Sequence, residues 1–315
     1  MPELLTQPVR IGVSACTDRC PVRYNGKSFD LLAVLGRERT SFAVTPVCPE
    51  CMAGLGVPRE PIHLTGDGSD VLAGRAHVRD RHGRDLTARL VAGASACLDA
   101  LERAGVEAVV AKEGSPSCGL YQARTGRARR QSAGAGVFGA MLLERDWFLL
   151  PDTALASPLR WWDARRRLHA WLWLRRREID SAARLQETWH VLKYLVQELD
   201  RPLADEIGRD VASMAAFDSA LAESVRARVQ PVLRRQSEPR RIRQSMWKAY
   251  ARFRKRGDLA PGEVCVDAPD EPLGSRAVAE ELLQLEKVSY QHELLFGPSP
   301  VLARSGPYRP RGSRS

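Results

Sequence analysis

The sequence contains no apolar stretch of the roughly 20 residues that a membrane-spanning helix requires. It also has no N-terminal apolar run with a basic flank, and no internal repeat. These absences argue against a membrane protein and against an exported one, so we expect a soluble, cytoplasmic chain. Its 315 residues exceed what one typical core accommodates and indicate two domains of ordinary size.

The chain has seven cysteines, an odd number that rules out complete disulfide pairing. In a reducing compartment, thiols bind metal, react or pack more often than they form disulfides. None of the six histidines has a metal-ligand spacing. The cysteines are therefore the first candidates for chemistry.

Charge is unevenly distributed around a formal net value of +10. Residues 1–150 hold 19 of the 48 Lys and Arg and 16 of the 38 Asp and Glu, which leaves 29 basic and 22 acidic residues in 151–315. This excess favours a polyanionic partner such as RNA for the second half. The alternative is that an arginine-rich composition merely reflects a GC-rich genome.

Three short apolar runs end close to a cysteine. They are residues 11–13 before Cys16, residues 42–47 before Cys48, and residues 106–111 before Cys118. Helical patterns lie between these runs, which predicts an α/β domain with a Rossmann-like parallel sheet over residues 1–150. Because ligands bind beyond the carboxyl ends of parallel strands, we expect the three cysteines to meet at one rim of the sheet.

Further patterns fill in the rest of the chain. In the first domain we expect a weak helix over residues 31–39, a hairpin over 71–84 with His82 and Gly83 in its turn, and helices over 87–104 and 134–145. Beyond residue 151, helical patterns over 158–200, 202–230, 240–256 and 276–296 predict an all-α basic domain over residues 151–305. The basic tail, residues 306–315, is expected to be disordered.

Three thiolates from separate strand ends suit an iron-sulfur cluster with one iron free of protein ligands, or a zinc ion with an open position. A competing hypothesis pairs Cys16 with Cys20 and Cys48 with Cys51 around a four-thiolate structural zinc, and Cys-x-x-Cys is also the spacing of a redox pair. Cys97, within an apolar helical pattern, is expected to pack in the core. Cys265 stands in a loop-like stretch without obvious partners.

The cysteine segments read IGVSACTDRCPVRYNG, VTPVCPECMAGLGVPREP and KEGSPSCG. Together they resemble the thiouracil desulfidase (TudS-like) family from about residue 10 to residue 146. The resemblance implies a [4Fe-4S] cluster held by Cys16, Cys48 and Cys118, and removal of sulfur from thiolated uracil with release of sulfide. It also implies that Glu50 is the carboxylate of the site. The catalytic serine is Ser115 or Ser117, which the motif does not separate.

The chain departs from that family pattern in two places. Thr17, Asp18 and Arg19 stand where the family commonly has Leu-Leu-Gly, and Cys20 and Cys51 are extra thiols near the site. Both departures bear on whether the site has only three ligands.

The residue types agree with such chemistry. An open iron binds the soft thiocarbonyl sulfur as a Lewis acid would, and Glu50 deprotonates or orients water. A serine hydroxyl donates a proton or a hydrogen bond, or only caps the turn. The candidates for contacts with the substrate are Arg23, Tyr24, Asn25, Arg59 and Lys112, although YNG is also ordinary turn chemistry.

The second half matches the family less well. Longer relatives join the desulfidase domain to a helical domain and act on 4-thiouridine in transfer RNA, but the His-rich helix of that partner domain is not evident here. Arginines lie among tryptophans around Arg160, Trp161, Trp162, residues 165–167 and residues 175–177, and further Arg and Lys residues recur from 234 to 256. Charges combined with aromatic residues in this way are typical of RNA-binding helices. The alternative is a bundle with tryptophans in the core and arginines on solvated faces.

We therefore expect a [4Fe-4S]-dependent desulfidase of thiolated uracil, with 4-thiouridine in transfer RNA favoured over free thiouracil or thiouridine as the substrate. Two other hypotheses remain: a zinc-stapled RNA-binding protein without catalysis, and a cluster-containing sensor or adaptor.

Overall fold

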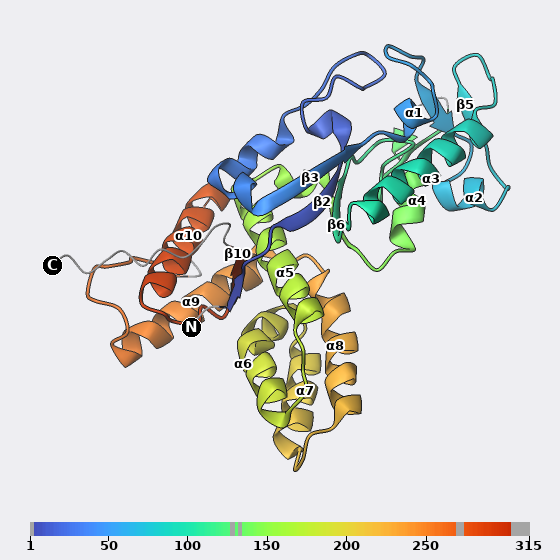
Figure 1. The fold of residues 1–315 in the computed structure, drawn as a ribbon. Coiled ribbons are helices and arrows are strands. Elements are labelled where there is room, and N and C mark those ends of the chain that lie inside the picture. Colours follow the sequence, from blue (N-terminus) through green and yellow to red (C-terminus); the bar gives the residue numbers. More distant parts are fainter. Residues whose placement is uncertain (1–2, 127–129, 132–133, 269–273, 304–315) are drawn as a thin grey trace. The chain divides into compact units, whose positions relative to one another are not determined.

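The computed structural model describes residues 3–126, 130–131, 134–268 and 274–303. The expected disordered tail, residues 306–315, lies outside these ranges. The chain divides into two compact units. One, here called the α/β unit, is Val9–Ala156; the other, here called the helical unit, combines the first eight residues with residues 157 onward (Figure 1).

The α/β unit is built on a parallel sheet with strand order β3–β2–β6–β9. The strands are β2 (Val9–Ser14), β3 (Phe42–Val47), β6 (Ala108–Ala111) and β9 (Phe148–Pro151). Ser14 pairs with Val47, and Ala111 pairs with Pro151, so their carboxyl ends lie at one edge. The central strands β2 and β6 are buried almost throughout, as short apolar runs predict, while the edge strands β3 and β9 are only partly buried. This confirms the parallel Rossmann-like sheet.

Helix α3 (Thr87–Arg103) packs closely on this sheet, with α4 (Val137–Leu143) beside it (Figure 1). A Cβ atom on Gly12 of β2 would lie 2.9 Å from a Leu101 methyl of α3, so glycine permits this approach. Helix α4 is shorter than expected because Gly136 is extended and serves as its N-cap. Cys97 is fully buried in this core, as expected.

Two expectations in the α/β unit need correction. Residues Leu31–Ser41 form 3₁₀ turns interrupted at Gly36, whose φ of 49° is non-helical, instead of an α-helix. The segment that pairs with β5 (Val78–Asp80) is β4 (Ile62–Leu64), while residue 71 lies in the short helix α2 (Gly68–Leu72). The turn at Gly83 is confirmed, with its N–H donating to the Asp80 carbonyl at 3.1 Å.

A second small sheet, with strand order β5–β4–β7–β8, was not expected from the sequence. Strands β7 (Arg124–Thr125) and β8 (Arg130–Gln131) have two residues each. Runs of two or three residues are too short to show an alternating pattern.

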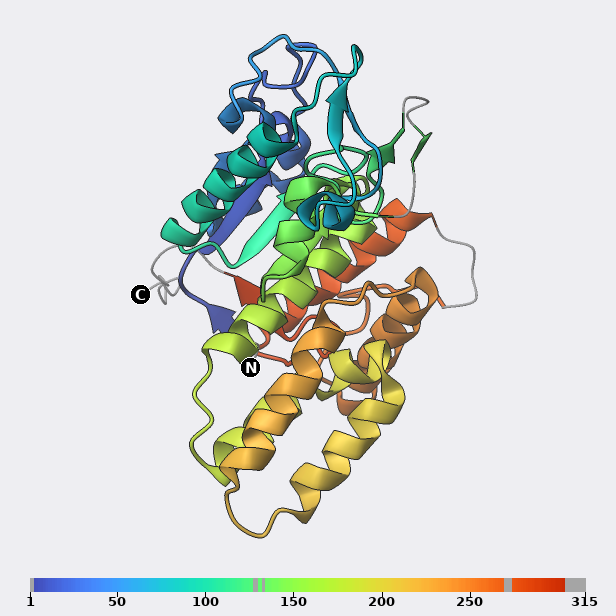
Figure 2. The same ribbon diagram turned by 90° about the vertical axis from the view of Figure 1, so that its right-hand side faces the viewer.

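The helical unit contains six α-helices in its described residues: α5 (Pro158–Arg176), α6 (Ala182–Leu199), α7 (Arg201–Ser213), α8 (Ser219–Leu233), α9 (Pro239–Arg256) and α10 (Ser275–Gln291). Helices α6, α7 and α8 pack side by side (Figures 1 and 2). The pattern expected over 202–230 is two helices, because the Asp218 carboxylate accepts from the Ala220 N–H and begins α8 anew.

One β feature interrupts this helical unit. Strand β1 (Glu3–Leu5) pairs in parallel with β10 (Val301–Ala303), so the unit is mainly rather than entirely helical. The fold class, a parallel α/β unit plus a helical region, is otherwise as expected. No helix in the described parts of the chain is long and apolar enough to cross a membrane.

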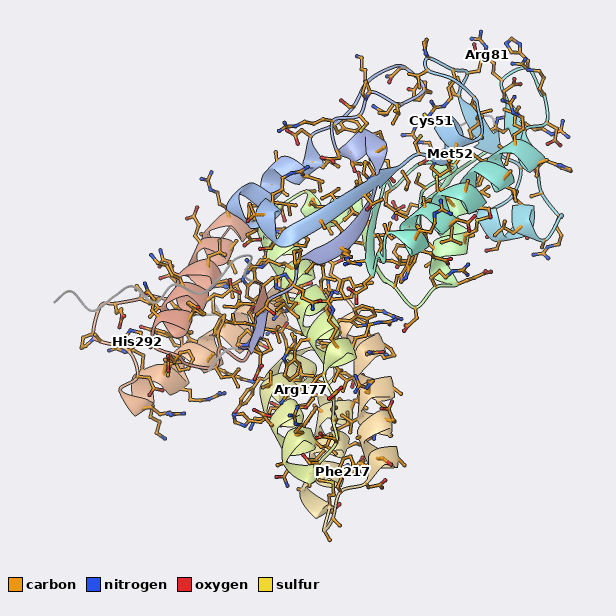
Figure 3. All side chains as sticks on the ribbon, in the orientation of Figure 1. Cys51, Met52, Arg81, Arg177, Phe217 and His292 are labelled. Carbon is orange, nitrogen blue, oxygen red and sulfur yellow. The ribbon has the colours of Figure 1, made fainter. Side chains whose placement is uncertain are left out.

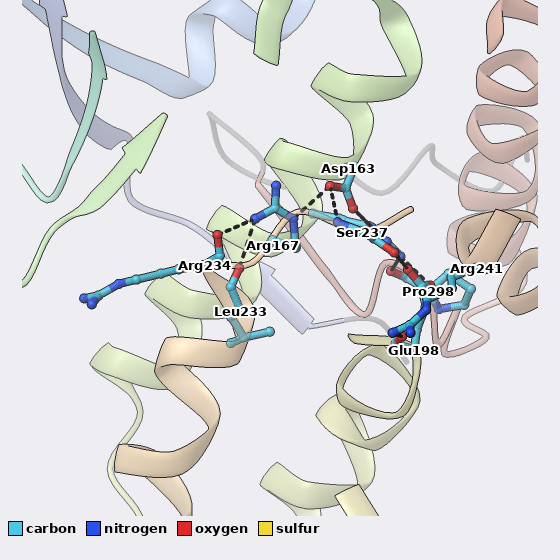
Figure 4. Close-up of polar contacts among 9 residues, drawn as sticks. Asp163, Arg167, Glu198, Leu233, Arg234, Ser237, Arg241 and Pro298 are labelled. Atoms are coloured by element: carbon cyan, nitrogen blue, oxygen red, sulfur yellow. Dashed lines mark hydrogen bonds and ion pairs between the residues drawn. The ribbon is translucent and has the colours of Figure 1, made fainter. Parts of the chain in front are cut away.

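The arginine cluster expected to contact RNA is buried inside the helical unit. Arg166 is fully buried; its guanidinium donates to Asp163 Oδ1 at 2.8 Å, to the Pro298 carbonyl at 2.9 Å and to both carboxylate oxygens of Glu198. Arg167 donates to Asp163 Oδ2 at 3.0 Å and to the carbonyls of Leu233 and Arg234 at 3.2 and 3.1 Å (Figure 4). These arginines therefore join helices to one another.

The residues close to these two arginines in the sequence are also buried inside the helical unit. Arg165 pairs with Glu286 of α10 at 2.5 Å, and Trp161 and Trp162 are buried. The expectation that residues 165–167 contact RNA is therefore wrong. The alternative, a helical bundle, correctly placed the tryptophans in the core. It was wrong about these arginines, which are buried and do not lie on a solvated helix face.

Candidate active site

A cavity of about 280 Å³ lies at the carboxyl ends of β2, β3 and β6. Cys16, Cys48 and Cys118 all line it, as expected for cysteines that follow three parallel strands. Cys16 lies in a 3₁₀ turn (Ala15–Thr17) directly after β2, and Cys48 is the N-cap residue of α1 (Pro49–Met52) directly after β3.

Cys118 is held by a loop that folds on its own polar groups. The carboxylate of Glu113 accepts from the N–H groups of residues 120, 121 and 122 at 3.1–3.2 Å. The Ser115 hydroxyl oxygen accepts from the N–H of Ser117 at 3.2 Å and of Cys118 at 3.1 Å. These bonds satisfy the backbone donors of the loop and fix the third cysteine at the cavity.

Glycines allow helices to press against the cysteine segments. A Cβ atom on Gly139 of α4 would lie 1.9 Å from the Gly119 carbonyl oxygen, next to Cys118. A Cβ atom on Gly93 of α3 would lie 2.4 Å from the Pro49 carbonyl oxygen, next to Cys48. Because backbone atoms cannot rotate away, a larger residue at either place must move the segment that carries the cysteine.

We predict that Gly139→Ala lowers the free energy of unfolding by about 1–3 kcal/mol, the usual cost of overpacking. The matched control is Gly208→Ala in α7, where the nearest atom to the new Cβ is Trp189 Nε1 at 3.7 Å. That change should be neutral or stabilising by up to about 1 kcal/mol, since alanine is the better helix former. Urea unfolding followed by circular dichroism measures both. Equal effects of the two substitutions would contradict the tight packing.

The buried cavity disfavours the charged thiolate form of its cysteines. Burial raises the pKa of Cys16 to about 11 and that of Cys48 to about 12, and it raises the pKa of Cys118 well above its ordinary value. The charges of Lys112 and Arg23 act in the opposite direction on the Cys16 pKa, but less strongly. A bound metal cation favours thiolates at such a site.

A single zinc ion and a cluster place different demands on the arrangement of thiol donors. A zinc ion bound by thiolates at about 2.3 Å requires sulfurs roughly 3.8 Å apart around one point. Among the described residues, which include every cysteine, no three His, Cys, Asp or Glu side chains converge in this way. Cys20 and Cys51 do not line the cavity; Cys51 lies on α1 (Figure 3).

Three thiols that line one cavity suit a cluster by their chemistry, since each thiolate binds a different iron. Cys16, Cys48 and Cys118 line the same cavity. These are the residues that could hold a cluster.

Glu50 is fixed in the same cavity by two partners. Its Oε1 accepts from the Ser117 hydroxyl at 2.8 Å, and its Oε2 pairs with Arg59 Nε at 2.5 Å. The Arg59 side chain is only 5% exposed and the Glu50 side chain 14% exposed. The structure thus separates the two serines: Ser117 is buried and touches Glu50, whereas Ser115 lines the cavity and caps the loop.

Arg59 also organises the rim of the cavity. Its Nη1 donates to the Gly56 carbonyl and its Nη2 to the Val22 carbonyl, both at 2.9 Å. The Arg59 N–H donates to the Tyr24 carbonyl at 2.9 Å. Arg59 therefore joins α1 to two loops as well as pairing with the carboxylate.

The remaining substrate-contact candidates divide into two groups. Arg23, Tyr24 and Lys112 line the cavity. Asn25 does not: its side-chain oxygen accepts from the Lys27 N–H at 3.2 Å, which is ordinary turn chemistry.

Phe29 is among the lining residues that the sequence did not point to, together with His63 and Arg124. Its ring is 4.5 Å from the Arg23 guanidinium carbon and 5.5 Å from Lys112 Nζ, and its N–H donates to the Cys16 carbonyl at 2.7 Å. Lys112 also pairs with Asp152, directly after β9, at 2.7 Å. Phe29 lies in a loop whose sequence has no helical or strand pattern. The only signals for its position were the nearby cations Arg23, in the same loop, and Lys112, at a strand end.

Residues 11–153 match the 2-thiouracil desulfurase family. The uncharacterized protein YbbK of Bacillus subtilis (strain 168) is 31% identical over 148 residues, which are 45% of this chain and 95% of YbbK. The chain belongs to the 2-thiouracil desulfurase family.

A solved structure is also similar. The [4Fe-4S]-dependent thiouracil desulfidase TudS has 33% sequence identity to this chain, with coverage of 47% of this chain and 93% of TudS and a TM-score of 0.40. The 2-thiouracil desulfurase match falls within the α/β unit and includes every candidate site residue named above. It ends at residue 153, before the helical unit begins.

Proposed function

We propose that the α/β unit is a [4Fe-4S]-dependent desulfidase that converts thiolated uracil into the oxo base and sulfide in the cytoplasm. The observation that carries the proposal is one cavity lined both by thiols that follow three strands and by a carboxylate held in place by two partners. Membership of the 2-thiouracil desulfurase family supports the same substrate class.

Cys16, Cys48 and Cys118 would hold the cluster. When bound, the cluster supplies an iron without a thiolate ligand, a Lewis acid for the soft thiocarbonyl sulfur. The overall reaction is hydrolytic: water gives its oxygen to the ring carbon, the carbon-sulfur bond breaks, and sulfur leaves as hydrogen sulfide. No oxidant or reductant is consumed.

Glu50 is the group that accepts the proton of the attacking water in this proposal. The Ser117 hydroxyl and Arg59 each occupy one of its oxygens, so the carboxylate cannot rotate away from the cavity. Each oxygen keeps a second lone pair for water. Ser117 is a positioning residue because it acts through Glu50.

Arg23 and Lys112 lie beside the Phe29 ring at the cavity; Asp152 neutralises Lys112, which leaves Arg23 as a positive charge for the substrate. A guanidinium suits the phosphates next to a nucleoside in RNA better than a neutral free base. We therefore propose 4-thiouridine in transfer RNA as the substrate, with the helical unit supplying further contacts.

We predict that Glu50→Gln retains the cluster but loses activity by about 10²- to 10⁴-fold, because an amide of the same shape is not a base. The matched control is Glu60→Gln, whose carboxylate pairs with Arg81 and does not line the cavity. Sulfide release and iron content are measured on each protein. Full activity in a cluster-replete Glu50→Gln protein would remove the assigned role.

The two other hypotheses make different predictions for the same preparation. A zinc-stapled RNA-binding protein contains zinc without iron or labile sulfide. A sensor or adaptor contains the cluster but does not turn over thiolated nucleosides.

A further inference from the structure

The helical unit contains a cavity of about 570 Å³ that has no part in the chemistry above. It lies where the end of α6 and the start of α7 face α9 and the segment Gly297–Pro298. We propose that this cavity binds the phosphodiester backbone of an RNA strand. The inference rests on the proposed function and deepens it. It assigns RNA binding to an accessible cavity, since the arginines at 165–167 are buried.

One face of α9 supplies three of the four cations that line the cavity; the fourth, Arg201 of α7, pairs with Asp205 at 3.0 Å. Arg241, Lys248 and Arg252 are spaced by seven and four residues, so they lie on the same side of the helix. Ser245 lies between them on that face. The apolar residues one position further on, among them Met246 and Phe253, are buried in the core and fix the orientation of α9.

The three cations of α9 are held in place without being neutralised. The Arg252 guanidinium lies 4.0 Å from the ring centroid of Tyr194, a contact that orients it and leaves its N–H donors available. Arg241 Nη1 donates to the carbonyls of Glu198 and Leu199, at 3.4 and 3.3 Å, which end α6. Within the part of the chain that the structure describes, none of Arg241, Lys248 and Arg252 forms an ion pair with a carboxylate.

The acidic residues at the cavity form ion pairs and hydrogen bonds with other residues. Glu198 pairs with the buried Arg166 and accepts from the Ser237 hydroxyl at 2.6 Å. Asp200 caps α7 through the Leu203 N–H at 3.2 Å and pairs with Arg235 at 3.1 Å. The cavity is therefore positive, and an anion with several phosphates gains contacts with more than one of its cations.

Phosphate groups match the available donors. Guanidinium groups bind phosphate oxygens through paired N–H donors, and Lys248 adds a mobile point charge. A chain of linked phosphates spans separate cations on one helix face, whereas a single phosphate reaches fewer of them. RNA is thus preferred over inorganic phosphate or a mononucleotide, which share the same chemistry.

The test compares two charge-matched double variants of the full chain. Lys248→Gln with Arg252→Gln removes cations of the cavity, and Arg240→Gln with Lys255→Gln removes exposed cations of the same helix that do not line it. Binding of unthiolated transfer RNA is measured by fluorescence anisotropy over a range of salt concentrations. The thermal midpoint of each variant, which must match the parent, confirms that the helical unit is folded.

We expect the cavity pair to weaken RNA binding about 10- to 100-fold at low salt. The slope of log K against log salt should fall by about 0.7–0.9 for each lost contact. The control pair should change the affinity less than about threefold, and inorganic phosphate or uridine monophosphate at matched phosphate concentration should displace little RNA. Equal effects of the two pairs would overturn the inference, as would complete displacement of RNA by the small phosphates.

Unthiolated RNA keeps this test separate from the desulfidase proposal. A parent protein that binds RNA through the cavity but releases no sulfide loses only the catalytic assignment. If the parent desulfurates free thiouracil but the variant without the cavity cations binds RNA as well as the parent does, only the proposed RNA site is refuted.

Discussion

Cys118→Ala protein, prepared anaerobically, should contain almost no iron and release no sulfide from thiolated uracil, whereas Cys51→Ala protein should retain most of both. Cys118 lines the cavity with Cys16 and Cys48, while Cys51 lies on α1 outside that lining. A cluster is held by thiolate ligands, so a protein that lacks one of its three ligands no longer retains the cluster. Iron and labile sulfide content measured on both variants gives the comparison.

Cys16→Ala and Cys48→Ala should behave like Cys118→Ala. Cys265→Ala is an additional control because this cysteine is exposed and belongs to the helical unit. If Cys51→Ala loses the iron and Cys118→Ala keeps it, the ligand set is wrong and a site that includes the Cys-x-x-Cys pair replaces it.

The second large effect is expected in the helical unit. Arg166→Met should lower its free energy of unfolding by about 3–5 kcal/mol, because the substitution leaves Asp163 and Glu198 buried without their cation. The control is Arg160→Met, an exposed position on the same helix, where the change should stay within about 0.5 kcal/mol. Urea unfolding followed by tryptophan fluorescence suits this test, since all but one of the seven tryptophans lie beyond residue 156.

A mild effect of Arg166→Met, similar to that of Arg160→Met, would contradict the structural role of the buried network. The same network explains why charge reversal at residues 165–167 is a poor test of RNA binding. Such a variant places carboxylates against Asp163, Glu198 and Glu286 and unfolds the unit, so any loss of RNA binding would be indirect.

The sheet and the meeting of the three cysteines were predictable for a simple reason. Buried parallel strands are short and apolar, and all parallel strands end at the same edge, so Cys16, Cys48 and Cys118 had to come near one another. Glu50 was predictable because it follows Cys48 in the motif. That Ser117 and not Ser115 bonds to Glu50 was not, because it depends on how the loop folds around Glu113.

The arginines of α5 show where sequence patterns fail. Helix α5 is buried on nearly every side, so it shows no apolar stripe opposite a polar one. Its arginines resemble a basic surface until their partners are known, and Glu198 and Glu286 lie 32 and 121 residues away from Arg166 and Arg165. Only tertiary structure reveals such pairs. Phe29 was missed for a similar reason, since a loop residue acquires its neighbours only on folding.

The central claim is tested most directly by incubating the anaerobically prepared, iron-loaded full chain with a thiolated uracil nucleoside. Sulfide and the oxo nucleoside should be measured together over time. The proposed reaction predicts that both form at a ratio of one to one, over many turnovers and without an added oxidant or reductant. A protein that carries its full complement of iron yet releases no sulfide, or forms sulfide without the oxo product, would contradict it.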